Sequence, residues 1–206
     1  MSKGLEGIVA AATAISYIDG MNGRLFYRGI DINELAQHSN FEETTALLWY
    51  GKLPTQSQLD SFVQKFRDNR QIPNEILALL MSLPKKTAPM EVLRTAVSAL
   101  SSYDPEDLDN SLEANVHKST RLTASMPTIV AAWDRIRKGQ WPILPSATLG
   151  HAANFLYMLT GKEPDPKAAQ VLDTCLILHA DHGLNASTFS ARITASTLSD
   201  LHSAIT

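Results

Sequence analysis

Disulfide bonds within this chain are excluded, because its 206 residues contain one cysteine, Cys175. A lone thiol fits a reducing compartment. The first residues, Met1–Glu6, lack the apolar core of a signal peptide, and no apolar run approaches the length that crosses a bilayer. We therefore predict a cytoplasmic protein that has no membrane as a partner.

Positive charge is also sparse. The chain has 18 Lys and Arg against 21 Asp and Glu, a net charge of −3. The basic residues are scattered, and no stripe combines them with stacking aromatics, so nucleic acid is not a predicted partner. The length is enough to bury a substantial core as one domain or a large part of one.

Helix signals dominate what remains, and only the beginning of the chain has an extended pattern. Residues 14–19 and 24–27 flank Gly20–Gly23, which predicts a small hairpin with an Asn-Gly turn. Asn40 and Thr55 are good helix caps, and prolines 73, 89 and 105 fit the first turns of later helices. Residues 106–138 are predicted as one helix interrupted at Pro127. We predict an all-α, multi-helical fold with a small N-terminal β-hairpin.

The most informative segment is residues 166–188. Ala168, Leu172, Cys175, His179 and His182 recur at spacings of four and three, which predicts a helix from Pro166 to His182. Because it is apolar all round near its end, we expect this helix to be among the most buried. Gly183 fits its left-handed end.

This interpretation places His179, Asp181 and His182 in the last turn, followed by Asn185. The helix dipole there favours a proton on imidazole, and buried ionisable groups need partners. A lone histidine on an apolar stripe is usually a core residue, but this cluster also fits a site, and the pattern leaves both interpretations open. A metal interpretation of His179 and His182 has little support, because no cysteine pair or further histidine-rich segment accompanies them. We predict no metal site.

At these residues the chain resembles the citrate synthases, especially the shorter bacterial type. The signature is His179-Ala-Asp-His-Gly-Leu-Asn-Ala-Ser-Thr-Phe-Ser-Ala-Arg192. Other segments follow in the family's order along the whole chain: Gly4–Val9, Thr13–Ser16, Ile18–Gly20, Leu25–Asp31, Phe41–Glu43, Leu47–Pro54, Pro89–Ser98, Met126–Ala131 and Asn154–Gly161. Three positions depart from the family: Ala88, where His is frequent, Gly183, where Glu is frequent, and His202, where an aromatic residue is usual.

The resemblance implies that residues 1–206 are the N-terminal portion of the family's large helical domain. The Gly-Pro-Leu-His and Gly-His-Arg motifs of the family are missing, as are its small domain and C-terminal helices. The family's catalytic base and its two catalytic histidines are therefore expected beyond Thr206, and no catalytic residue is expected within this chain.

For the site, the resemblance implies that His182 binds oxaloacetate with Asn185 as its neighbour. His179 and Asp181 are expected to hold the pocket in shape. The implied substrates are oxaloacetate and acetyl-CoA, with no cofactor, and a homodimer or larger homo-oligomer is expected.

Three functions are compatible with the sequence. The first is a citrate synthase of which this chain is an N-terminal fragment, inactive by itself. The second is a 2-methylcitrate synthase of the same family, which uses propionyl-CoA. The third is a non-catalytic helical assembly module.

Overall fold

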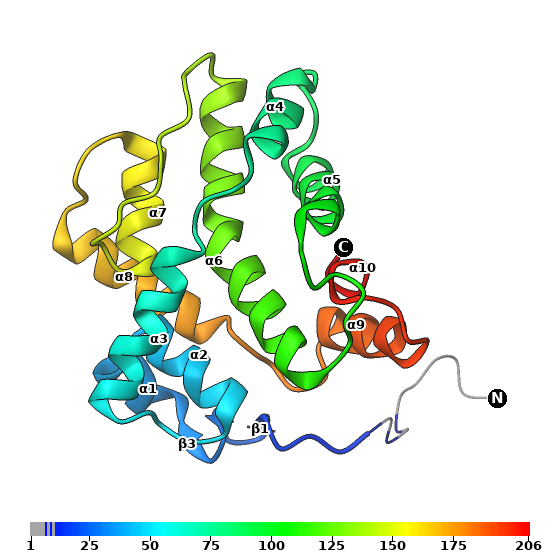
Figure 1. The fold of residues 1–206 in the computed structure, drawn as a ribbon. Coiled ribbons are helices and arrows are strands. Elements are labelled where there is room, and N and C mark those ends of the chain that lie inside the picture. The colour runs from blue at the N-terminus through cyan, green and yellow to red at the C-terminus, as the bar shows by residue number, and fades with distance from the viewer. Residues whose placement is uncertain (1–6, 8, 10) are drawn as a thin grey trace.

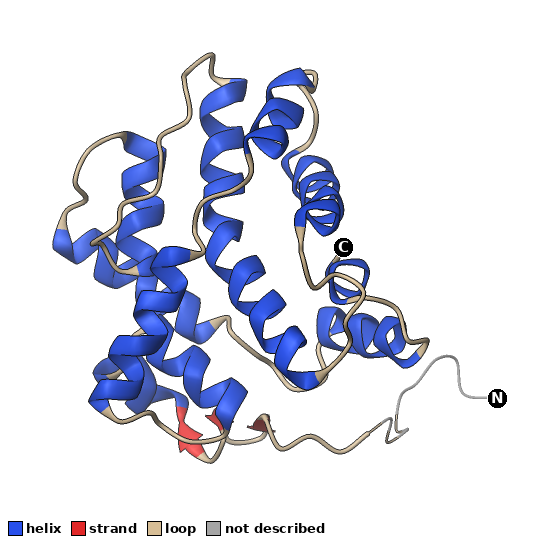
Figure 2. Cartoon of the chain, in the orientation of Figure 1, coloured by secondary structure: helices blue, strands red, loops and turns tan. Residues whose placement is uncertain are grey.

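The structure is a computed structural model that describes residue 7, residue 9 and residues 11–206. Most of this chain is helical, with a small sheet near the N-terminus, as predicted (Figure 2). The first family-like segment, Gly4–Val9, lies largely outside the described residues. In the described part, no helix is both long enough and apolar enough to span a membrane.

The sheet is antiparallel, and the predicted hairpin forms two of its strands. Strand β1 (Ser16–Asp19) pairs with β2 (Arg24–Tyr27) so that Ser16 lies opposite Tyr27. The turn between them uses Gly23 at φ +63°, a conformation that costs little without a Cβ. A short third strand, β3 (Ile30–Asp31), was not predicted and pairs with β2.

Ten helices and one 3-10 turn follow in the described part of the chain (Figure 1). They are α1 (Ile32–His38), α2 (Phe41–Tyr50), α3 (Gln56–Asp68), α4 (Asn74–Ser82), α5 (Pro89–Leu100), η1 (Ser101–Tyr103), α6 (Leu112–Arg137), α7 (His151–Thr160), α8 (Pro166–Leu178), α9 (Ala186–Ser196) and α10 (Leu201–Ile205).

Local sequence signals explain several helix starts. Asn40 caps α2 by accepting from the Glu43 amide, and Thr55 forms a capping box with Gln58 on α3. Pro89 occupies the first turn of α5, as predicted. Pro73 instead lies just before α4 as its cap residue.

The helix predicted from residue 106 begins later, at Leu112, with Ser111 as its cap. The reason is a buried cation. Lys118 is fully buried, and its Nζ donates to the carbonyl oxygens of Asp107 at 3.2 Å and Asp109 at 2.6 Å. Because these carbonyls accept hydrogen bonds from the ammonium group, they are not used in a helix. Residues 104–110 therefore form turns, and Pro105 does not begin a helix.

Helix α6 is the centre of the fold (Figure 1). It packs against α3, α4, α5 and α7 and contains Pro127 within its length. The largest apolar core lies between α4, α5 and α6 and includes Leu80, Val92, Ile129 and Trp133, each at most 3 % exposed.

The prediction for residues 166–182 is partly wrong. Helix α8 ends at Leu178, four residues early, and of its residues only Ile177 is buried. Cys175 is exposed rather than buried. Leu172 and Leu176 line an open apolar groove of about 400 Å³ between α6, α7 and α8. The apolar pattern was therefore recognised correctly, but no element among the described residues covers that face of the helix.

Candidate functional site

The predicted site residues lie on a loop rather than on a helix. We call residues 179–185, which join α8 to α9, the histidine loop. Gly183 has the expected positive φ of 65°, but it turns the loop and ends no helix. The predicted effect of the α8 dipole on His182 was therefore wrong, because His182 lies beyond the end of that helix.

Asp181 is the buried centre of this loop, only 9 % exposed. Its Oδ2 accepts a hydrogen bond of 2.5 Å from Ser16 Oγ. The same hydroxyl accepts from the Gly183 amide at 2.9 Å. One serine of strand β1 thus binds both a carboxylate and a backbone amide of the loop, which fixes the path of the chain.

Tyr27 fixes the loop from the neighbouring strand. Its hydroxyl lies 3.0 Å from the carbonyl oxygens of both Ile177 and Asp181, and it accepts from the Asp181 amide at 3.1 Å. Burial raises the pKa of the Tyr27 phenol, so it remains a proton donor at neutral pH. Because Ser16 and Tyr27 lie opposite each other in the sheet, the hairpin positions the loop.

Asn185 is brought next to Asp181, as the cluster predicted. Its Nδ2 lies 3.4 Å from Asp181 Oδ1, and its Oδ1 accepts from the Thr188 amide at 2.9 Å to cap α9. The side chain therefore joins the loop to the next helix, and its amide oxygen is already used by that helix.

The two histidines are exposed. His179 caps the end of α8, where its Nδ1 donates to the Cys175 carbonyl at 2.7 Å. The imidazole of His182 forms no hydrogen bond with any residue that the structure describes. His182 is therefore displayed at the surface on a loop whose backbone is fixed by buried groups.

A second titratable cluster was missed by sequence reasoning. Glu42 and Arg70 are almost fully buried, and Glu42 Oε1 accepts from the His151 amide at 2.8 Å, which caps α7. Asp173 caps α2 by accepting from the Phe41 amide at 3.1 Å. These residues come from three helices, α2, α7 and α8, and from the α3–α4 connection, so no local spacing could reveal them.

Burial shifts the pKa values of two groups of this cluster in opposite directions. It lowers the pKa of His151 to about 4, with Arg70 adding to the effect. It raises the pKa of Asp173 to about 6, partly offset by the hydrogen bond from Phe41. Helix capping accounts for the two carboxylates, so we treat the cluster as structural.

The fold and the loop together define a multi-helical protein whose small N-terminal sheet fixes a histidine-bearing loop between two helices. Comparison with known proteins identifies the group. A family model described as "Citrate synthase, C-terminal domain" matches residues 4–206. The chain belongs to the citrate synthase family.

Individual relatives support the same family assignment. The chain is 47 % identical to a citrate synthase of Haloferax volcanii, covering 100 % of this chain and 55 % of the relative. It is 43 % identical to a 2-methylcitrate synthase of Mycobacterium tuberculosis, covering 100 % of this chain and 52 % of the relative. The crystal structure of a Pyrobaculum aerophilum citrate synthase matches with a TM-score of 0.92 at 42 % identity, covering 98 % of this chain and 52 % of that one. The chain spans about half the length of the relatives it matches.

Proposed function

We propose that the protein containing this chain is a citrate synthase, an acyltransferase that condenses acetyl-CoA with oxaloacetate. The methyl carbon of the thioester, after losing a proton to a base, bonds to the ketone carbon of oxaloacetate. Water then cleaves the thioester to release citrate and CoA. Membership of the family, with similarity along the whole chain, carries this proposal.

Within this chain, His182 is proposed to bind oxaloacetate. Its support is the combination of an exposed imidazole with a backbone held by buried Asp181, Ser16 and Tyr27. A substrate-binding group must be accessible to the ligand. It binds more tightly when its backbone is already ordered, because binding then costs less conformational entropy. A charge-assisted hydrogen bond from imidazole to a carboxylate is one of the stronger contacts available.

The start of α9 adds a second favourable feature for a dicarboxylate. The first amides of a helix have no partner within it, and the positive end of the helix dipole attracts anions. Asn185 satisfies the Thr188 amide, which leaves the earlier amides of the helix available. We assign Asn185 to the oxaloacetate pocket as the neighbour of His182. Asp181 and His179 position the loop.

The remaining machinery is proposed to lie in the part of the protein outside this chain. The reaction requires a base, a group that stabilises the enolate and a donor that polarises the ketone. The chain corresponds to about half of each relative, and we propose that it is the N-terminal portion of the large domain. Residues 1–206 alone are then inactive. No metal or organic cofactor takes part in this proposal, and the protein is proposed to act as a cytoplasmic homo-oligomer.

A 2-methylcitrate synthase is the second candidate, because relatives with both names match this chain at comparable identity. The two activities differ in the acyl thioester, propionyl-CoA replacing acetyl-CoA. We place citrate synthase first because several relatives of that name are somewhat more similar to this chain.

The test is thiol release from acetyl-CoA in the presence of oxaloacetate, measured for the protein at its natural length and for residues 1–206. We expect turnover only at natural length, with acetyl-CoA preferred over propionyl-CoA. A preference for propionyl-CoA would select the second candidate. Absence of turnover with either thioester would overturn the enzymatic proposal and favour an assembly module.

A further inference from the structure

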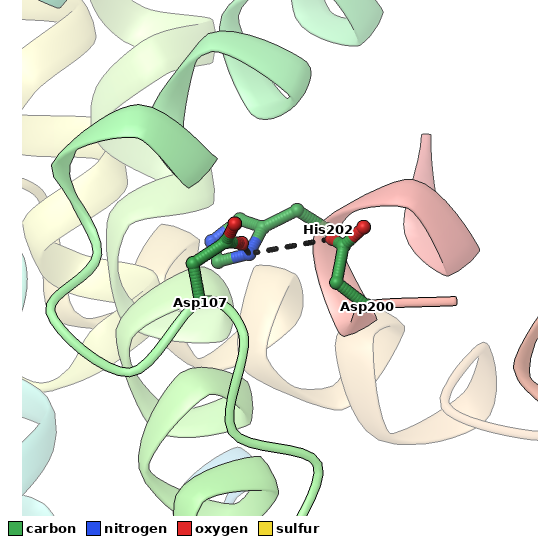
Figure 3. A group of neighbouring side chains, drawn as sticks. All are labelled: Asp107, Asp200 and His202. Atoms are coloured by element: carbon green, nitrogen blue, oxygen red, sulfur yellow. Dashed lines mark ion pairs between the residues drawn. The ribbon is translucent and has the colours of Figure 1, made fainter. Parts of the chain in front are cut away.

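One partly buried side-chain cluster, centred on the buried His202, belongs to no part of the proposed reaction. It joins His202 of α10 to the turns before α6 and to the start of α10 (Figure 3). In the described part of the chain, Asp107, Asp200 and His202 are the one group of three side chains whose ligand atoms all lie within 4.8 Å of one another.

Two atoms of this cluster lack a hydrogen-bond partner although they are buried. These are His202 Nδ1 and Asp107 Oδ1, which lie 3.2 Å apart. The distance is that of an ion pair, but the two groups are not aligned as a hydrogen bond. His202 itself is only 2 % exposed. Buried polar atoms without partners are rare, and an ion is one common explanation.

The local charge balance is also incomplete. Arg121 neutralises Asp104 and Glu106 with contacts of 2.7 and 2.8 Å. Lys118 directs its ammonium to main-chain carbonyls. Among the described residues, the carboxylates of Asp107 and Asp200 have no Lys or Arg within ion-pair distance, and the His202 ring is their shared ion-pair partner. One imidazole therefore faces these two carboxylates, in addition to the Asp104 carboxylate that Arg121 neutralises.

The surroundings also orient the ring. Asp104 Oδ2 lies 3.6 Å from Nε2, on the opposite side of the imidazole from Asp107. Nδ1, the other ring nitrogen, faces Asp107 and Asp200. Histidine ligands of metals are commonly held by a carboxylate in this way.

We propose that His202 Nδ1, Asp107 and Asp200 bind a divalent transition-metal ion of the size of Zn²⁺. Zn²⁺ is bound by imidazole nitrogen and carboxylate oxygen at about 2.0–2.2 Å, which places neighbouring ligand atoms about 3.4 Å apart. The distances from His202 Nδ1 to Asp107 and Asp200 are 3.2 and 4.0 Å, so modest side-chain movement completes the site. Asp107 is partly exposed, which lets water supply the remaining ligand.

The donor set and the position define what the ion does. An imidazole ligand favours Zn²⁺ over Mg²⁺ or Ca²⁺, which prefer oxygen ligands alone. The ion cross-links α10 to the turns between η1 and α6. Its ligands Asp107 and Asp200 are 93 residues apart along the chain. It is thus a structural site that ties the last helix of this chain to the α5–α6 core. No local sequence pattern indicates this site, because Asp107 is distant from Asp200 and His202 along the chain.

The test is calorimetric titration of the chelator-treated protein, at natural length, with ZnCl₂ and separately with MgCl₂. We expect the parent protein to bind Zn²⁺. In Asp107→Asn the affinity should fall at least about tenfold, a loss typical of groups that support a metal site. Asp60→Asn, which alters an exposed carboxylate on α3, is the matched control and should bind Zn²⁺ as the parent does.

Two further measurements keep the proposal open to refutation. Anomalous diffraction from crystals of the unmodified protein soaked in Zn²⁺ should place the ion between Asp107 and His202, whatever the variants do. His179→Gln separates this site from binding at the exposed histidine loop. The proposal is overturned if Zn²⁺ does not bind, if Asp107→Asn binds as tightly as the parent, if affinity falls only in His179→Gln, or if Mg²⁺ binds as tightly.

Discussion

The α4–α6 region and the α8–α9 region of this molecule both carry apolar side chains but are packed very differently. Helix α6 buries twelve residues. Helix α8 buries only Ile177, and α9 buries none. The first region contains the largest apolar core of the described residues. The second has an apolar groove that no described residue fills, and it carries the candidate site.

The difference indicates how the two regions acquire order. The α4–α6 core is held by side-chain burial over a wide area. The histidine loop is held by a few buried hydrogen bonds to the N-terminal hairpin. We expect the first to tolerate the loss of polar contacts and the second to depend on them.

The largest expected effect is in the packed core. Leu80 on α4 is 0 % exposed. Leu80→Ala should destabilise the protein by about 2–5 kcal/mol, the usual cost of a core cavity. Met81→Ala, one residue along and 41 % exposed, is the control and should cost much less. Denaturant unfolding compares the two, and equal losses would contradict the assigned packing.

The next effect is on the pH dependence of stability, and it distinguishes the buried His151 from the half-buried Asp173. The native pKa of His151 is about 4 against an ordinary 6.5, so the unfolded chain binds the proton first as pH falls. Stability due to neutral His151 is present above pH 6.5 and is lost as pH falls towards 4. In His151→Gln, the drop in unfolding free energy between pH 7 and pH 4 should shrink by about 2–3 kcal/mol.

Asp173 should act in the opposite direction. Its pKa is raised from 3.8 to about 6, so the folded state holds the proton more tightly and stability falls as pH rises through that window. Asp173→Asn should therefore make the loss of stability on acidification steeper than in the parent. The effect is reduced by solvent, since Asp173 is only half-buried. Unfolding curves at several pH values would show whether the two variants change the slope with opposite signs.

A smaller effect is expected where the hairpin meets the loop. Tyr27→Phe removes the hydroxyl that contacts the backbone of Ile177 and Asp181 and leaves those polar groups unsatisfied. The expected loss is about 1–3 kcal/mol. Amide hydrogen exchange should increase in residues 179–185 and stay unchanged in α4. Unaltered exchange in the loop would mean that the hairpin does not position it.

The smallest effect is expected on α8. Cys175 is exposed, so Cys175→Ser should change the unfolding free energy by no more than about 0.5 kcal/mol. Thermal unfolding of residues 1–206 and of the protein at natural length gives the comparison. A larger loss at natural length alone would show that other segments cover α8.

The sequence predicted the all-α class, the hairpin and the caps Asn40 and Thr55, because these depend on short-range chemistry. It also predicted that Asp181 and Asn185 lie side by side. It did not predict that α8 ends at Leu178 or that Asp181, rather than His182, is buried. Those outcomes depend on Ser16 and Tyr27, more than 150 residues earlier. The buried cluster of Glu42, Arg70 and His151 was invisible for the same reason.

The central claim is that an exposed His182, on a loop fixed by buried groups, binds oxaloacetate. Calorimetric titration of oxaloacetate into the natural-length protein tests it most directly. His182→Ala should weaken binding by about 1.5–3 kcal/mol, the value of a charge-assisted hydrogen bond. The unfolding free energy should not change, and Cys175→Ser should bind as the parent does. Unchanged oxaloacetate affinity in His182→Ala would contradict the account.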